Sequence, residues 1–321
     1  MIVKERKVPL HLKKIEAIKR RIDSKHSKQP ALAEERSKRL AGFRGEQSLD
    51  YYFSQLPKTN YYILHDVRIQ RNHFFQLDTL ILTTRFLLHL EVKNISGTLY
   101  FDRSFNQLIR NYDGKEQAFP DPLLQAKRQQ KHLQSWVAEN QFPAMPILPL
   151  IVISHPSTII KSEVGGSMQK VIHAAALLDK IEQLEQKYQK EILQIKDLKK
   201  MSRLLIKQHT PSNPDILKTF QINEKEIKTG VHCPKCSFLP LEKSKKGWYC
   251  PACMDYDKHA HIEALKDYAY LMGLTITNQQ AREFLQVDSR SIVTRLLKAL
   301  NLQYTGNLKG RKYILPLEFY E

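Results

Sequence analysis

Two short apolar runs between residues 75 and 93 carry charged residues that a buried strand normally excludes. Residues 75–82 read FQLDTLIL, and residues 86–93 read FLLHLEVK. Because side chains alternate between the two faces of a strand, Glu91 and Lys93 should point to one side while the leucines and valine between them fill the other. We therefore expect a sheet that is apolar except for one charged edge.

Buried charge is unfavourable unless it is paired or bound to a metal. If the two runs pair across the turn at residues 83–85, Asp78 lies beside Glu91, and hard cations such as Mg²⁺ bind through one or two carboxylates. Lys93 would then orient or deprotonate an attacking water. A Glu-x-Lys triplet alone is more often a solvated pair at a strand end. The hypothesis of a metal site therefore depends on Asp78.

A third carboxylate precedes these runs. Glu46 shares a helical face with Leu49 and Phe53, so we expect it to point inward with the apolar stripe. It is either a capped structural residue or a further group at the metal site. A metal and a lysine leave little need for a histidine base, but His89 stays a candidate because it shares a strand face with Glu91 and Lys93.

The order of the motifs provides a more specific signal. They are Gly45-Glu46, Gln76-Leu77-Asp78, Leu90-Glu91-Val92-Lys93-Asn94 followed by Gly97, and Asp121-Pro122-Leu123-Leu124-Gln125. Over roughly residues 40–155 this series resembles the NERD (nuclease-related) domain of the PD-(D/E)XK nuclease superfamily. Leu77 stands where the superfamily's name has proline, at a position that varies.

The resemblance implies a restriction-endonuclease-like core. In that core Asp78 and Glu91 would bind Mg²⁺ or Mn²⁺, and Lys93 would serve the water. Glu46 and Gln125 would support the site. Without the resemblance, Gln125 would be read as an exposed residue in the first turn of a helix.

The net charge indicates a polyanionic partner. The chain has 51 Lys and Arg against 33 Asp and Glu, a net charge of +18, and such an excess favours nucleic acid, most simply DNA. Residues 1–41 hold 13 basic and five acidic side chains, and we expect a basic helical segment there that is either solvated or contacts phosphates. No apolar run is long enough to span a membrane and no signal peptide is recognisable, which predicts a cytoplasmic protein without a membrane partner.

Hydrophobic periodicity predicts an α/β order of elements. The short apolar run at 147–153 suits a buried central strand, and apolar residues recur every three or four positions over residues 170–207, as in one or two helices. The expected core comprises a helix at 43–56, strands at 61–69, 75–83, 86–92, 98–101 and 147–153, and a helix at 122–140.

All four cysteines form two C-x-x-C pairs. Their spacing predicts four thiolate ligands for a structural Zn²⁺, in a small zinc ribbon. Disulfides are the alternative, although they are rare in the cytosol. The four predicted ligands are Cys233, Cys236, Cys250 and Cys253.

Three helices, at 261–272, 277–286 and 288–300, are expected after the ribbon, the third capped by Asp288. A hairpin at 302–315 follows, which together with the helices is typical of a winged helix-turn-helix. Between residues 289 and 316 there are six basic residues and no acidic one, as a phosphate-facing surface requires. A small helical bundle that binds protein is the alternative. The basic residues are Arg290, Arg295, Lys298, Lys309, Arg311 and Lys312.

The predicted fold class is α/β, with a restriction-endonuclease-like mixed sheet flanked by helices, then a zinc ribbon and a small helical, winged-helix-like domain. The expected function is a metal-dependent nuclease acting on DNA. A catalytically silent DNA-binding or regulatory protein and a nuclease acting on RNA are the alternatives. The expected boundaries are 1–41 (basic helical segment), 42–155 (NERD core), 156–210 (helical extension), 211–230 (linker), 231–260 (zinc ribbon) and 261–321 (winged-helix-like domain).

Overall fold

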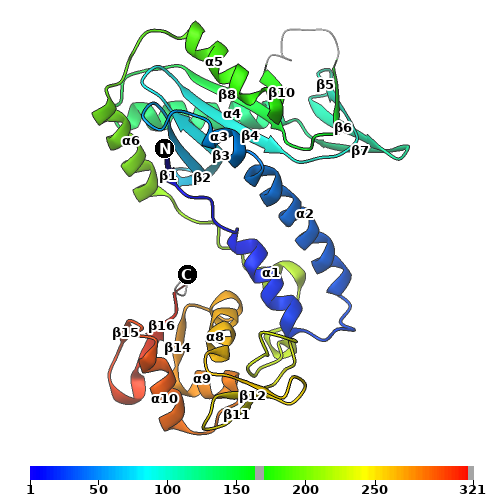
Figure 1. Ribbon diagram of the computed structural model, residues 1–321, viewed down its shortest axis with the longest axis vertical. Coiled ribbons are helices and arrows are strands. Elements are labelled where there is room, and N and C mark those ends of the chain that lie inside the picture. Colours follow the sequence, from blue (N-terminus) through cyan, green and yellow to red (C-terminus); the bar gives the residue numbers. More distant parts are fainter. Residues whose placement is uncertain (163–169, 317–321) are drawn as a thin grey trace. The chain divides into compact units, whose positions relative to one another are not determined.

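The protein is described from a computed structural model, which covers residues 1–162 and 170–316. The chain forms two compact units (Figure 1). Unit 1 comprises Met1–Val8 and Lys38–Ser212, and unit 2 comprises Pro9–Ser37 and Asn213–Glu321.

A six-stranded mixed sheet forms the centre of unit 1. Its strand order is β1-β2-β3-β4-β8-β10. Strands β2, β3 and β4 are antiparallel neighbours, whereas β8 pairs in parallel with both β4 and β10, and β1 pairs in parallel with β2. The expected mixed α/β architecture is therefore confirmed. The strands are β1 (Ile2–Lys4), β2 (Tyr62–Gln70), β3 (Phe74–Leu82), β4 (Leu87–Lys93), β8 (Ile147–Ile153) and β10 (Val171–His173).

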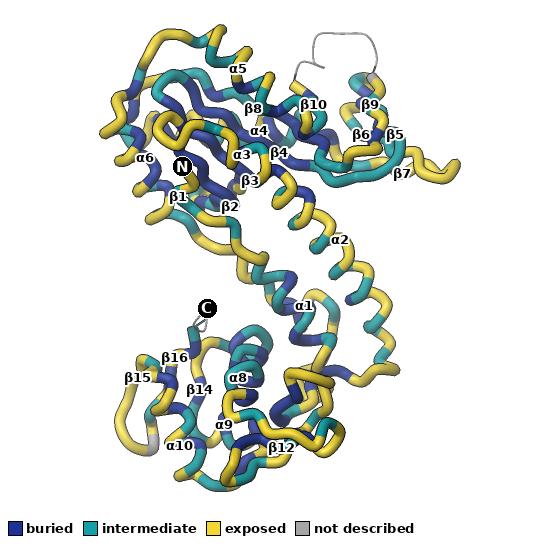
Figure 2. The backbone as a smooth tube through the Cα atoms, in the orientation of Figure 1, coloured by how far each residue is buried: buried dark blue, intermediate teal, exposed yellow. Residues whose placement is uncertain are grey.

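Helices cover both faces of this sheet (Figure 1). Apolar residues of α4 (Pro122–Glu139) and α6 (Ile195–Gln208) form one core with β2 and β3, and that core includes Trp136. Residues of α3 (Asp50–Ser54) and α5 (Leu177–Lys187) join a second core with β4 and β8. Burial is nearly continuous along the central strands (Figure 2), as expected for strands packed on both faces.

Unit 1 also contains a second sheet, of four strands. Only one of these strands was predicted from the sequence, the one expected at residues 98–101, which is β5. The order of the sheet is β7-β6-β5-β9, and its core contains Leu99, Phe101 and Leu108. The polar sequence of its outer hairpin gave little hydrophobic signal. The strands are β5 (Thr98–Asp102), β6 (Gln107–Tyr112), β7 (Lys115–Pro120) and β9 (Ile159–Ser162).

The N-terminal 41 residues contribute to both units. Strand β1 extends the sheet of unit 1, while the apolar stripe of α1 (Leu10–Arg21) buries Ile15 and Ile18 in the core of unit 2. The guanidinium of Arg21 is fully buried, and its Nε donates to Asp267 Oδ2 over 2.8 Å. Residues 29–47 form α2 (Gln29–Gln47), so this segment is not a solvated tail.

In its described residues, unit 2 contains two three-stranded sheets and four α-helices in addition to α1 and the first part of α2. One sheet has the order β11-β12-β13, and the other has the order β14-β16-β15. Short 3₁₀ helices occur at Ala174–Ala176 in unit 1 and at Glu224–Glu226 and Leu308–Gly310 in unit 2. The elements are α7 (Ile216–Phe220), β11 (Glu242–Lys243), β12 (Trp248–Cys250), β13 (Asp255–Asp257), α8 (Ala260–Leu271), β14 (Thr275–Thr277), α9 (Asn278–Leu285), α10 (Arg290–Ala299), β15 (Tyr304–Thr305) and β16 (Lys312–Ile314).

Two details of unit 2 differ from the sequence-based expectation. The N-cap of α10 is Ser289, whose side chain accepts from the backbone N–H of Ile292, so the prediction of an Asp288 cap was wrong. The segment 211–230 contains α7, which buries Ile216 and Leu217 in the core of unit 2. Among the described residues, no helix is both long and apolar enough to cross a membrane.

Candidate active site

Antiparallel pairing of β3 and β4 brings two carboxylates together. Thr79 pairs with Leu90, and continuing this register by one residue places Asp78 opposite Glu91. Directly opposed residues in a sheet point to the same face. The backbone N–H of Val92 donates to Asp78 Oδ2 over 2.9 Å, which fixes one oxygen of Asp78.

Glu91 is buried, and its two oxygens have different surroundings. Its Oε1 accepts from Lys93 Nζ over 2.7 Å and from Gln125 Nε2 over 2.7 Å. Lys93 Nζ also donates to Gln125 Oε1 over 3.3 Å, which closes a triangle of three side chains. Glu91 Oε2 is buried and has no hydrogen-bond partner among the described residues. That oxygen is available to a ligand.

The position of Gln125 follows from how α4 begins. Asp121 caps the helix by accepting from the backbone N–H of Leu123 over 2.7 Å, and Pro122 occupies the first turn. Arg103 donates to the other Asp121 oxygen over 3.1 Å. A proline and a capping aspartate fix the helix start, so Gln125 in the first turn is directed at Glu91.

Glu46 belongs to the same cluster but is held by a residue that the sequence did not indicate. Arg6, whose side chain is 5% exposed, donates to Glu46 Oε2 over 2.7 Å, to Asp50 Oδ1 over 3.2 Å and to His65 Nδ1 over 3.0 Å. The contact joins positions 40 residues apart. No local pattern signals such a long-range ion pair.

Gly45 lets α2 approach closely the residues that follow the central strands β4 and β8. A Cβ at this position would collide with the side chains of Asn94 and Ser154. Asn94 Nδ2 in turn donates to the backbone carbonyl of Ala41 over 2.7 Å. The absence of a side chain at Gly45 therefore allows Glu46 to lie near the strand ends that carry the other acids.

The electrostatics of the cluster favour binding of a cation. Burial raises the pKa of Asp78 well above its usual range, and the nearby charges of Glu91 and Glu46 raise it further. Burial raises the pKa of Glu46 to about 7, against the opposing effect of Arg6. Carboxylates that resist ionisation because they are close together gain most from a divalent cation.

His89 is fully buried beside this cluster, with Nε2 4.0 Å from Glu91 Oε2. Burial and the charge of Lys93 lower the pKa of His89 to about 3. The imidazole is therefore neutral at physiological pH and only a weak base.

The donor set fits a hard divalent cation. It consists of carboxylate oxygens from two adjacent strands, and one of them is a buried oxygen that has no hydrogen-bond partner in the described part of the chain. Mg²⁺ and Mn²⁺ prefer oxygen ligands of this kind.

Residues 41–154 match the family model of NERD, the nuclease-related domain. The match covers a little over a third of the chain and contains Glu46, Asp78, Glu91, Lys93 and Gln125. The comparisons with curated proteins and with solved structures found no match. Arg6 lies outside the matched NERD residues, although it touches Glu46 within them.

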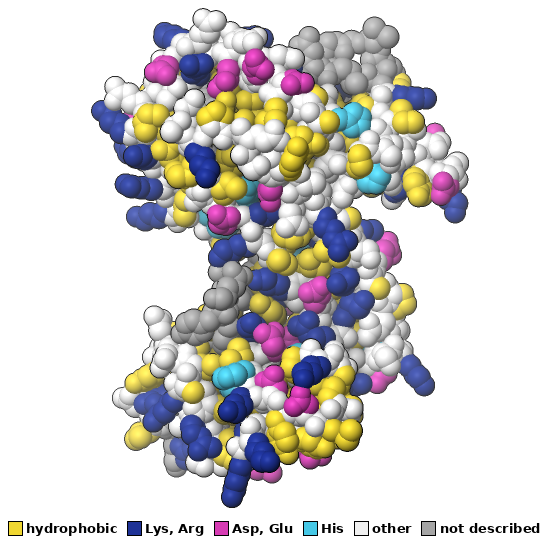
Figure 3. All heavy atoms as spheres, in the orientation of Figure 1, with side chains coloured by type: hydrophobic (Ala, Val, Ile, Leu, Met, Phe, Trp, Pro, Cys, Tyr) yellow, Lys and Arg dark blue, Asp and Glu magenta, His cyan; other side chains and the backbone are white. Residues whose placement is uncertain are grey.

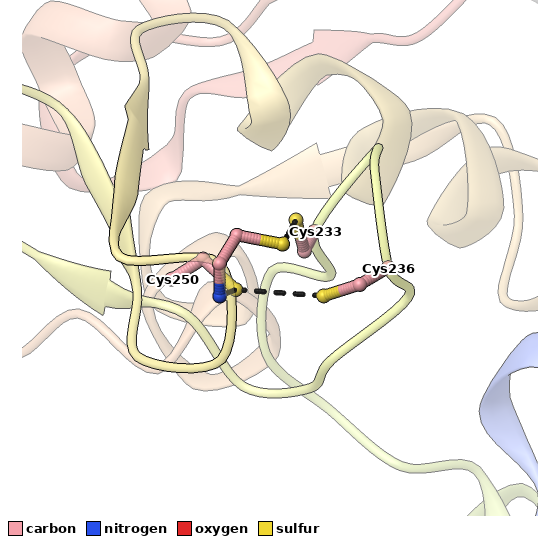
Figure 4. Close-up of side chains that lie close together, drawn as sticks. Cys233, Cys236 and Cys250 are labelled. Atoms are coloured by element: carbon pink, nitrogen blue, oxygen red, sulfur yellow. Dashed lines mark hydrogen bonds between the residues drawn. The ribbon is translucent and has the colours of Figure 1, made fainter.

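The four cysteines form a separate cluster outside the NERD domain. Their sulfur atoms all lie within 4.8 Å of one another, with Cys236 and Cys250 3.6 Å apart and Cys233 and Cys253 3.9 Å apart (Figure 4). A tetrahedron with Zn–S bonds of about 2.3 Å has edges of about 3.8 Å. The arrangement is therefore compatible with the predicted structural zinc site.

The predicted nucleic-acid residues fall into two groups within unit 2. Arg290, Arg295 and Lys298 line a hollow of about 480 Å³ along α10, together with Ser291 and Thr294. In the hairpin the guanidinium of Arg311 lies 4.1 Å from the centroid of the Tyr304 ring, and Lys312 belongs to β16. The side chain of Lys309 lies outside the described part of the structure.

Proposed function

We propose that this protein is a metal-dependent nuclease that hydrolyses phosphodiester bonds of DNA. Its active site would contain Asp78, Glu91 and Lys93. One observation carries the proposal. Glu91 is held at Oε1 by Lys93 and Gln125, while its Oε2 is buried, unpartnered among the described residues and on the same sheet face as Asp78. A purely structural carboxylate would have both oxygens satisfied.

Each residue has a distinct task in the proposed reaction. Asp78 and Glu91 would hold Mg²⁺ or Mn²⁺, which when bound polarises the scissile phosphate and stabilises the leaving oxygen. Lys93 orients the attacking water beside the phosphate.

Gln125 acts through the carboxylate. It keeps Glu91 in one orientation by donating to Oε1. Glu46 adds negative charge to the cluster in its ionised form, and Arg6 positions it.

Unit 2 would supply the remaining parts of the proposed function. Zn²⁺ bound by the four cysteines would fix the ribbon, and the basic residues of α10 and of the hairpin would contact phosphates. We also propose a cytoplasmic location, since unpaired cysteines of this kind are typical of a reducing compartment.

Cleavage assays with labelled supercoiled, linear and single-stranded DNA, and with RNA, test the proposal. Each substrate is incubated with Mg²⁺, with Mn²⁺ and with EDTA, for the wild type and Asp78→Ala. We expect metal-dependent cleavage of DNA that falls by at least about 100-fold in the variant. Binding of DNA without cleavage under either metal would favour the catalytically silent alternative, and cleavage of RNA alone would change the substrate.

A further inference from the structure

One exposed face of α6 carries five basic residues and lies outside both the matched NERD residues and the predicted nucleic-acid residues. They line a shallow hollow of about 410 Å³ together with Leu204. Figure 3 shows dark blue side chains gathered along the edge of unit 1 over α6. We call these residues the α6 basic row: Lys196, Lys199, Lys200, Arg203 and Lys207.

The spacing of the row explains its alignment. Residues three and four positions apart lie on one face of a helix, and every member of the row has another member three or four positions away. The opposite face buries Leu198, Met201 and Leu205 against the sheet. The row therefore points away from the sheet, and its 11 intervals span about 16 Å at a rise of about 1.5 Å per residue.

Within the described residues, no acidic side chain forms an ion pair with the row. The nearest acid in sequence, Asp197, caps the helix instead, accepting from the backbone N–H of Gln194 over 3.0 Å. Like charges three and four residues apart destabilise a helix. The row thus opposes the stability of α6, and a bound anion would relieve this repulsion.

The row leads toward the catalytic end of the sheet. Near the start of α6, the backbone N–H of Leu193 donates to Thr84 O, in the turn between β3 and β4. At the other end, His209 bridges to Ile69 of β2. Ile69 pairs with Phe75, which precedes Asp78 by only three residues. Lys207 therefore lies toward the end of the sheet where β4 presents Glu91 and Lys93.

We propose that the α6 basic row binds the phosphate backbone of duplex DNA and holds it along unit 1. The choice of DNA rests on the proposed function. A duplex carries about one negative charge per 1.7 Å when both strands are counted, so the 16 Å of duplex beside the row carries about nine phosphates, more than enough for five basic side chains. Sites for single strands combine cations with aromatic side chains on which bases stack, and none of the six residues that line this hollow is aromatic. Duplex DNA is thus the occupant that the row fits best.

The test measures binding without catalysis. The full-length zinc-loaded protein is titrated against a fluorescent 20-base-pair duplex without Mg²⁺ or Mn²⁺, over a series of KCl concentrations. For Lys199→Gln/Arg203→Gln we expect the Kd in 0.1 M KCl to rise by about 10- to 60-fold. The slope of log K against log [KCl] should fall by about 1.8, since each lost phosphate contact removes about 0.9.

The matched control is Lys187→Gln/Lys190→Gln, at the end of α5 and just after it, where α5 packs on the other face of the sheet. It removes the same charge and should change the Kd by less than about 2-fold. The α6 variant should melt no lower than the wild type, because it removes like-charge repulsion.

Three outcomes would overturn the inference: an unchanged salt slope, an equal loss in the control, or row-dependent binding to phosphatidylserine vesicles but not to the duplex. None of these outcomes depends on cleavage. The nuclease proposal would fail by a different result, equal cleavage by the wild type and Asp78→Ala, so the two failures can be told apart.

Discussion

Glu91 illustrates at the residue scale how neighbours can hold a side chain and still leave it able to bind a ligand. The amide of Gln125 and the ammonium of Lys93 both donate to Oε1 and fix it. Oε2 is buried and accepts no hydrogen bond from the described residues. Strand alternation predicted that Glu91 and Lys93 share one face, and the expected pairing of the two runs across the turn placed Asp78 beside Glu91. The orientation of each oxygen depends on α4 and Gln125, which come from a later part of the chain.

Ionisation of Glu46 should make unit 1 less stable as the pH rises. Its pKa is about 7 in the folded protein against 4.5 ordinarily, so between these values the folded state binds the proton more tightly than the unfolded chain. Stability from this group is therefore present at low pH and lost as the pH rises from about 4.5 to about 7. From pH 5 to pH 8 we expect the wild type to lose about 2–3 kcal/mol more than Glu46→Gln.

Urea titrations followed by Trp136 fluorescence in a Trp248→Phe background measure this difference for unit 1. No divalent cation other than zinc is added, because a cation at the carboxylates would itself lower their pKa values. An identical pH dependence in the wild type and Glu46→Gln would contradict the assignment of a raised pKa to Glu46.

Arg6 should set the pH at which Glu46 ionises. Its charge and hydrogen bond lower the pKa of Glu46, so Arg6→Gln should raise that pKa further. We expect the cleavage rate to rise with pH as Glu46 ionises, and this rise should occur about 1 pH unit higher in Arg6→Gln. Arg44→Gln, an exposed position on the same helix, is the control and should leave the profile in place. A pH profile shared by all three proteins would show that Arg6 does not act through Glu46.

The start of α4 links stability to the site at the scale of one element. Asp121→Ala removes the cap on Leu123 and the partner of Arg103, and should cost about 1 kcal/mol of unit 1 stability. Asp121→Asn retains a capping oxygen and should cost less. Unfolding followed by Trp136, which lies on α4, measures both variants, and equal losses would argue against the cap.

Elements with strong periodicity were predictable and short or polar ones were not. The central strands and α4 have dense apolar patterns, and their observed bounds differ from the predicted ones by at most one residue. The hairpin of β6 and β7 is largely exposed. Its sequence therefore lacks the alternation of apolar and polar residues that marks a half-buried strand. Its one signal was Asp113-Gly114, whose positive φ angles of 50° and 75° form the turn.

Arg6 was unpredictable for a different reason. Its role depends on β1 joining β2, which brings the N-terminus to the sheet. Strand β1 has only three residues and pairs with β2 about 60 positions further along the chain. Such a pairing has no local sequence pattern. The cysteine cluster, by contrast, was predictable from spacing because four thiols in two C-x-x-C pairs have few alternative uses.

At the scale of the whole molecule, each unit contains one tryptophan and can be followed separately. Trp248 packs in the core of unit 2 with Cys233 and Cys250, whereas Trp136 lies in the core of unit 1. Removing zinc with a chelator should therefore change the fluorescence of Trp248 and leave that of Trp136 unchanged. Structural zinc contributes about 10 kcal/mol or more of binding free energy to folding.

Single-tryptophan variants, Trp136→Phe and Trp248→Phe, report the two signals, and restoring Zn²⁺ should reverse the change. Cys236→Ser/Cys253→Ser should mimic the chelator. A Trp248 signal that is insensitive to the chelator would contradict a folding role for zinc in unit 2.

The central claim is that Asp78 and Glu91 together hold a divalent cation. Titration of zinc-loaded full-length protein with Mn²⁺, with free Mn²⁺ measured by electron paramagnetic resonance, tests it most directly. We predict at least one Mn²⁺ bound per chain in the wild type and in Asp179→Asn, which changes an exposed acid on α5, and its loss in Asp78→Asn and in Glu91→Gln. Equal Mn²⁺ binding by all four proteins would contradict the account.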